Sequence, residues 1–112
     1  MIKDFYIFVE KTIMYLDNYL GQIREMCYKN RVKHLFAFGS VLTDTFSDES
    51  DVDLLVDLKS NDPFDYAENY FNLKFQLEEL LKRPVDLLEE KGLKNKYLLE
   101  SINQSKRLIY EA

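Results

Sequence analysis

The spacing of apolar residues predicts an alternation of helices and strands. Over residues 17–29, apolar side chains recur every three or four positions, as on one face of a helix. They are Leu16, Leu20, Ile23 and Cys27. Residues 32–38 and 52–58 are instead short apolar runs between polar residues, which is typical of strands. The nearly continuous apolar run at 35–38 also predicts a strand that is covered on both faces.

The second half of the chain continues this alternation. Asp62-Pro63 predicts the start of a helix that extends to about Leu81, because proline fits the first helical position. The apolar face of this helix holds Phe64, Tyr66, Tyr70, Phe71, Leu73, Phe75, Leu77 and Leu80. Residues 85–88 predict a third short strand, and residues 94–110 predict a last helix. One face of that last helix holds Leu98, Ile102, Ser105 and Ile109.

This order of elements predicts an α/β (α+β) fold. With a turn or short helix expected over residues 41–46, the chain gives a small sheet with helices packed against it. The 112 residues are the size of one domain, which we expect to span 1–112. Two interpretations of the N-terminus stay open. Residues 1–14 form a helix of the domain, or the segment up to residue 16 is an N-terminal extension or a partner-binding element.

Composition and charge narrow the class of protein. Hydrophobic residues make up 46% of the chain, which is enough for a core, and no apolar run is long enough to span a membrane. The N-terminus lacks the pattern of a signal peptide and the chain has 1 cysteine, so we expect a cytoplasmic protein without an internal disulfide. The net charge of −5 argues against broad nucleic-acid binding and suits a protein that binds Mg²⁺ or a basic partner.

Two short motifs are candidates for a nucleotide site. Gly39-Ser40 follows the first predicted strand, and Asp51 and Asp53 stand at the start of the second. Glycine lets the backbone approach a ligand, and the Ser40 hydroxyl with the backbone amides beyond it can bind an anion. Successive strand residues point to opposite faces, so Asp51 and Asp53 share a face and can bind a divalent cation. The alternatives are an ordinary turn capped by Ser40 and a solvated acidic strand end.

A third carboxylate, Asp86, lies in the next short strand. Three such carboxylates can hold two metal ions that bind the attacking and leaving oxygens of an in-line displacement, although a structural role fits Asp86 equally well. Oxygen ligands favour Mg²⁺ or Mn²⁺, and a calcium-binding EF-hand loop is excluded because its glycine and glutamate are absent. We interpret His34 as structural rather than as a ligand. Lys82 and Arg83 are more typical of a solvated loop than of phosphate contacts.

The combined pattern resembles a known family. Gly-Ser, ten residues, Asp-x-Asp, and a further aspartate on a following strand are similar to the polymerase-β-type nucleotidyltransferase superfamily. The similarity is strongest to the minimal nucleotidyltransferases (MNT), which are antitoxins of HEPN toxins, and it covers about Asn18 to Tyr110. The resemblance implies a small mixed β-sheet flanked by helices.

The resemblance also implies roles for the motif residues. Gly39 and Ser40 would bind the triphosphate of an NTP, ATP in the first instance. Asp51 and Asp53 would bind two Mg²⁺ ions, with Mn²⁺ as the alternative, and Asp86 would complete the metal site and help to take a proton. AMP would then be transferred to a hydroxyl of a partner protein, a tyrosine of a HEPN toxin, and the chain would act as an antitoxin. A homo-oligomer stays open.

A binding module without strong catalysis is the alternative hypothesis. In the family, the Gly-Ser is often followed by a small residue, then arginine and glycine, whereas Leu42, Thr43 and Asp44 stand at those places here. Such a module would neutralise a partner toxin by complex formation. Transfer to a small molecule or an RNA is less favoured, because the chain is short and acidic and has no second substrate domain.

Overall fold

The chain forms a four-stranded sheet of mixed direction. The computed structural model describes residues 15–43, 46–47 and 49–112. The strands are β1 (Val32–Phe38), β2 (Val52–Leu58), β3 (Val85–Glu89) and β4 (Arg107–Glu111), in the spatial order β3-β2-β1-β4. Strand β1 pairs antiparallel with β2 and β4, and β2 pairs parallel with β3. The predicted mixed sheet with flanking helices is confirmed.

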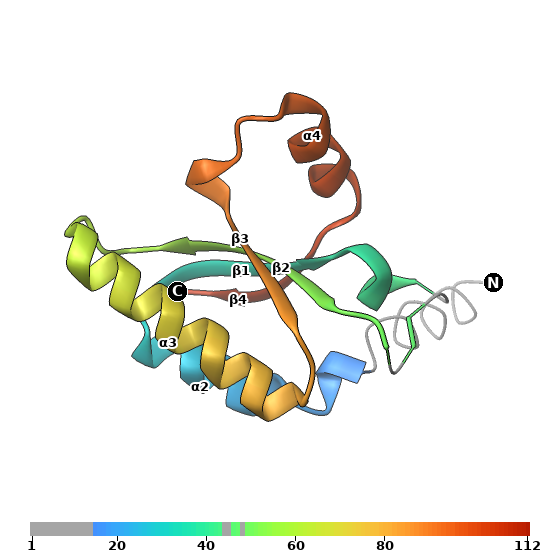
Figure 1. Ribbon diagram of the computed structural model, residues 1–112, viewed down its shortest axis with the longest axis horizontal. Helices are drawn as coiled ribbons and strands as arrows, with labels where there is room; N and C mark the ends of the chain where they lie inside the picture. Colours follow the sequence, from blue (N-terminus) through green and yellow to red (C-terminus); the bar gives the residue numbers. More distant parts are fainter. Residues whose placement is uncertain (1–14, 44–45, 48) are drawn as a thin grey trace.

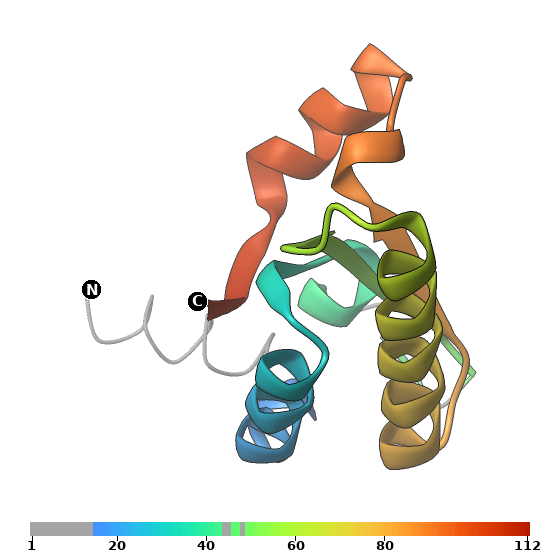
Figure 2. The same cartoon turned by 90° about the vertical axis from the view of Figure 1, so that its left-hand side faces the viewer.

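The helices lie on both faces of this sheet. Helices α2 (Leu20–Lys29) and α3 (Pro63–Leu81) lie on one face, and α4 (Lys96–Ser105) rises from the other (Figures 1 and 2). Two short 3₁₀ turns, η1 (Gly39–Leu42) and η2 (Glu90–Gly92), follow β1 and β3. None of the helices in the described ranges is long and apolar enough to cross a membrane.

Helix α3 begins where the sequence predicts. The Asp62 carboxylate accepts a hydrogen bond from the Phe64 amide at 2.8 Å, and Pro63 takes the first helical position. The stripe on this helix divides between two environments. Leu73, Leu77 and Leu81 are buried, whereas the side chains of Phe64, Phe71 and Phe75 are exposed. The leucines therefore anchor α3 on the sheet, and the phenylalanines lie outside the core.

The core lies between the sheet and the helices α2 and α3. Alternate strand residues, including Leu35, Ala37, Leu54 and Val56, are buried there against helix residues such as Leu73. The prediction that β1 is covered on both faces is wrong, because the residues between, Phe36 and Phe38, are half-buried. The physical reason is that α4, with ten residues, covers the second face only in part.

The prediction of a last helix over 94–110 is also wrong. Helix α4 ends at Ser105, and the following residues form β4, which pairs with β1 through Leu35 and Tyr110. Strand β1 has one edge that β2 does not occupy, and its unpaired backbone groups recruit a β-branched and aromatic segment of the chain. Ile109 is buried in β4, so the sequence pattern correctly marked it as a core residue although it predicted the wrong element.

Smaller differences concern the segment ends. The sequence predicts a short helix or turn over 41–46, but η1 begins earlier, at Gly39, and ends at Leu42, while residues 44–45 lie outside the described residues. The third strand extends one residue further than predicted, to Glu89. The structure does not describe residues 1–14, so it tests neither the predicted helix there nor the alternative of an N-terminal extension over those residues. Leu16, at the end of that interpreted extension, is fully buried in the core.

Candidate active site

The strand register brings Asp53 and Asp86 together. They are directly paired residues of the parallel strands β2 and β3. Their neighbours Leu54 and Leu87 are buried in the core, so the two carboxylates point to the opposite face, where α4 rises. Asp51 stands two residues before Asp53, at the entry to β2. The three carboxylates named from the sequence thus converge at one end of the sheet.

The charges at this point repel one another. The pKa of Asp53 is raised above its ordinary value, first because burial desolvates the carboxylate and then because of the negative charges of Asp86 and Asp51. A divalent cation would relieve this repulsion, so the oxygen set fits a hard ion such as Mg²⁺. The structure therefore shows an electrostatic coupling that the sequence spacing by itself could not establish.

Gly39 lies directly against Asp53. Its φ of +73° is in the left-handed region. A Cβ placed there would collide with Oδ2 of Asp53 and lie 3.3 Å from its Cγ. Phe38 is paired with Asp53 in the register of β1 and β2, which fixes this approach. The glycine at this turn is consequently required by space as well as by conformation, and Ser40 follows it in η1.

Arg83 holds the loop that leads to Asp51. Its Nη1 donates to the carbonyl oxygens of Ser47 and Ser50 at 2.9 and 3.0 Å. Its guanidinium carbon lies 4.5 and 4.6 Å from the ring centroids of Tyr15 and Phe46. The interpretation of Arg83 as a solvated loop residue is wrong, because residues distant in sequence enclose it. Sequence patterns carry no signal for such contacts.

The position at which the family often has arginine is Thr43. Its hydroxyl donates to the Ser40 carbonyl at 3.0 Å, which closes the turn after the Gly-Ser motif. Arg83 does not take the place of the arginine that the family often has at this turn, because the carbonyls of the loop bind its guanidinium. The described part of this turn therefore places no cation beside Gly39 and Ser40.

A second polar cluster lies further along the same strands. His34 of β1 is paired with Asp57 of β2, and the His34 Nε2 contacts the Glu90 carboxylate. The sequence predicts a structural role for His34, and Asp57 and Glu90 stand in no recognisable motif. The pairing of β1 with β2 brings His34 and Asp57 together, and this pairing cannot be read from the sequence alone.

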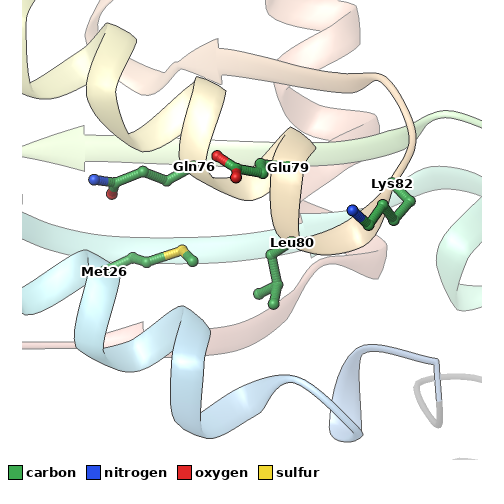
Figure 3. Close-up of a pocket in the computed structure, with 5 residues that line it drawn as sticks. All are labelled: Met26, Gln76, Glu79, Leu80 and Lys82. Carbon is green, nitrogen blue, oxygen red and sulfur yellow. The ribbon is translucent and has the colours of Figure 1, made fainter.

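A groove on the helical side carries no comparable chemistry. It is lined by Met26, Gln76, Glu79, Leu80 and Lys82 from the ends of α2 and α3 (Figure 3). These helices lie on one face of the sheet (Figure 2), and the strand register places Asp53 and Asp86 on the other face. The acidic cluster, rather than this groove, is the candidate active site.

Known proteins resemble this chain in sequence. Residues 21–112 match the family model described as "Polymerase beta, Nucleotidyltransferase". "Putative protein adenylyltransferase MJ1379" of Methanocaldococcus jannaschii is 35% identical over 99 residues, which are 81% of this chain and 96% of that protein. "Putative protein adenylyltransferase MJ0128" of the same organism is 33% identical over 101 residues, 89% of this chain and 98% of that protein.

Solved structures share the fold. "Structure of putative minimal nucleotidyltransferase" has a TM-score of 0.70 and 26% identity, covering 85% of this chain and 93% of that chain. A toxin–antitoxin crystal structure with AMP-PNP has a TM-score of 0.64 and 20% identity over 83% of this chain and 73% of that one. A structure of a tri-AMPylated Shewanella oneidensis HEPN toxin in complex with MNT antitoxin has a TM-score of 0.56 and 18% identity over 83% and 70%. The family match spans most of the chain and confirms the resemblance, and we conclude that the chain belongs to the polymerase-β-type nucleotidyltransferase family.

Proposed function

We propose that this protein is a Mg²⁺-dependent adenylyltransferase that moves AMP from ATP to a hydroxyl of a partner protein. The observation that carries the proposal is the convergence of Asp53, Asp86 and Asp51 beside Gly39. The curated relatives are named as protein adenylyltransferases. Similar folds occur in toxin–antitoxin complexes, one of which contains an AMPylated HEPN toxin. We therefore propose a HEPN-type toxin as the partner and one of its tyrosines as the acceptor.

The chain's own residues fit this chemistry. Asp51 and Asp53 would hold Mg²⁺, with Asp86 as the further ligand. Bound Mg²⁺ would neutralise triphosphate charge and make the α-phosphate more open to in-line attack. The hydroxyl oxygen would form a bond to the α-phosphorus while the bond from that phosphorus to the leaving pyrophosphate breaks. Asp86 would accept the proton of the attacking hydroxyl, and Gly39 would leave the backbone at Ser40 free to approach the triphosphate. Positioning and charge neutralisation are the main demands of this reaction, and no special nucleophile of the enzyme is needed.

Calorimetric titration of ATP with Mg²⁺ tests the site. The wild type should bind ATP only when Mg²⁺ is present, and Asp53→Asn should weaken binding strongly, because one of the proposed metal ligands loses its charge. The matched control is Glu68→Gln, which removes an exposed carboxylate of α3 and should leave binding unchanged. Equal ATP binding by wild type and Asp53→Asn would contradict the proposed site.

Transfer from labelled ATP to a HEPN protein tests the reaction. Asp53→Asn should lower the transfer rate by at least about 100-fold, the scale expected when an electrostatic contact to the transition state is lost. The fold should be retained, since Asp53 is partly exposed and an amide has nearly the same shape. Transfer that survives in this variant would refute the assignment of Asp53.

The second candidate function is neutralisation of a toxin by binding alone. Thr43, in place of the frequent arginine, favours it, because the turn then lacks a cation for phosphate. Under this alternative, Asp53→Asn should bind and silence the partner as well as the wild type does. Under the enzyme proposal, the variant should still bind the partner but should leave it active.

A further inference from the structure

We propose that His34, Asp57 and Glu90 form a second metal site, for a transition-metal ion of the Zn²⁺ class. Each residue offers one ligand atom, and the three atoms lie within 4.8 Å of one another. They come from three different segments, β1, β2 and η2. A single ion can therefore be reached by an imidazole nitrogen and two carboxylate oxygens. This second site is independent of the proposed adenylyltransferase activity.

The cluster is separate from the acidic site at Asp53. Asp57 is four residues further along β2, which at about 3.3 Å per residue is about 13 Å. Asp53, Leu55 and Asp57 point to the same face, and Leu55 between them is fully buried. Because a metal–ligand bond is about 2 Å long, one ion cannot be shared between the two sites. The sheet thus presents two polar positions divided by an apolar one.

The burial of Asp57 is a second observation in favour of a cation site at this cluster. Its exposed fraction is 5%, and its Oδ1 has no hydrogen-bond partner among the described residues. A buried carboxylate without such a partner is costly unless a cation is close. The Lys91 Nζ forms an ion pair with this oxygen at 3.3 Å, but the Lys91 side chain is 59% exposed, so water weakens the pair. A metal ion would satisfy Asp57 with shorter and directed bonds.

The ligand set selects the type of metal. Imidazole binds Zn²⁺ and its neighbours in the first transition row well, whereas Mg²⁺ and Ca²⁺ prefer oxygen ligands throughout. Two carboxylates together balance the charge of a divalent ion. Three protein ligands leave a fourth tetrahedral position for water. The ion would also tie η2, and with it the segment that leads to α4, to the central strands.

The test uses the fact that the chain has 1 histidine. In the metal-free full chain, the imidazole signals of His34 are followed by NMR during titration with Zn²⁺. We expect them to shift with a stoichiometry of one ion per chain, and to do so equally in Asp51→Asn/Asp53→Asn. The wild-type titration needs no variant, so a folding defect in a mutant cannot obscure it.

Calorimetry with Zn²⁺ then compares variants of the ligands. Asp57→Asn and His34→Gln should each lower the affinity by at least about 100-fold, since even the loss of second-layer partners costs about 10- to 100-fold. Glu68→Gln is the control and should bind as the wild type does. Unmoved imidazole signals in excess Zn²⁺ would overturn the proposal. They would show that His34, Glu90, Asp57 and Lys91 form an ion-pair network complete without metal. Zn²⁺ binding that is lost in Asp51→Asn/Asp53→Asn and kept in His34→Gln would equally overturn it.

Discussion

The Asp53 carboxylate can lie directly against Gly39 because glycine has no side chain. The positive φ of Gly39 and the nearby Asp53 carboxylate both exclude a Cβ at this position. Gly21, by contrast, lies in α2 with no atom within 4 Å of an added Cβ. The same residue type therefore has a positional role in the site and none in the helix.

This contrast gives a matched pair of predictions. Gly39→Ala should lower the free energy of unfolding by about 1–3 kcal/mol, through backbone strain and displacement of Asp53, and should weaken Mg²⁺-dependent ATP binding. Gly21→Ala should raise stability by about 0.5–1 kcal/mol, because alanine is the better helix former. Urea denaturation measures both. A Gly39→Ala variant as stable as Gly21→Ala would show that the close approach to Asp53 does not constrain the turn.

Burial changes the pKa of a single titratable group, the thiol of Cys27. Desolvation raises the pKa of its thiol to about 12, so the folded chain keeps the thiol neutral. The unfolded chain ionises near the ordinary pKa. At pH values between these two, the folded state binds more protons, and its stability falls as the pH rises through that interval.

Iodoacetamide labelling checks this prediction. At pH 9, Cys27 should react at least about 100-fold more slowly in the folded protein than in urea, because the thiolate is the nucleophile. The stability measured by urea should also decline above pH 9, and less so in Cys27→Ala. Equal labelling rates in the folded and unfolded states would contradict the burial of this thiol.

At the level of elements, the loop before β2 depends on the turn before β3. Arg83 spans them through two hydrogen bonds and two aromatic rings. Since Ser50 immediately precedes Asp51, this contact positions the carboxylate end of β2. Arg83 thus supports the site through the backbone of the loop that leads to it.

Arg83→Met tests this support. It keeps an apolar stem and removes the guanidinium, and we expect a loss of about 1–3 kcal/mol in stability from the hydrogen bonds to a charged group. Mg²⁺-dependent ATP binding should weaken as well. Lys82→Met, at the exposed neighbouring position, is the control and should change neither quantity appreciably.

The two faces of strand β4 differ in how deeply their side chains are buried. The exposed fractions of the neighbouring residues are 5% for Ile109 and 52% for Leu108. Ile109→Ala should lower the free energy of unfolding by about 2–4 kcal/mol, as expected for truncation in a core. Leu108→Ala should cost less than about 1 kcal/mol. Similar losses in urea denaturation for both variants would show that β4 does not present alternate faces to core and solvent.

At the scale of the whole molecule, stability is distributed unevenly across the sheet. Strands β1 and β2 are central, and every residue of β2 except Asp53 is buried. Helix α4 buries Ile102, whereas α3 buries three leucines against the opposite face. The helical side of the molecule is therefore the continuous core, and the site lies on the more open side (Figure 2).

Native-state hydrogen exchange should reveal this difference. Amides of β1 and β2 should exchange only through global unfolding, while those of α4 should exchange through local opening with a smaller free energy. Exchange in increasing urea, resolved by NMR or mass spectrometry, separates the two classes. Protection of α4 equal to that of β2 would mean that α4 unfolds with the core.

The sequence by itself determined the elements whose signals are local. The apolar period and Asp62-Pro63 located α3, and short apolar runs located β1 and β2. The Gly-Ser and Asp-x-Asp spacing was enough to identify the family, because those residues lie close together in the chain.

The tertiary structure decided what depends on partners distant in sequence. Ile109 continues the helical spacing of Leu98 and Ile102, yet the free edge of β1 pairs with this segment as a strand, β4. The enclosure of Arg83 and the meeting of His34 with Asp57 and Glu90 also depend on strand pairing. The physical reason is that periodicity reports which side of an element is apolar, whereas backbone pairing and charge contacts are selected only when the elements assemble.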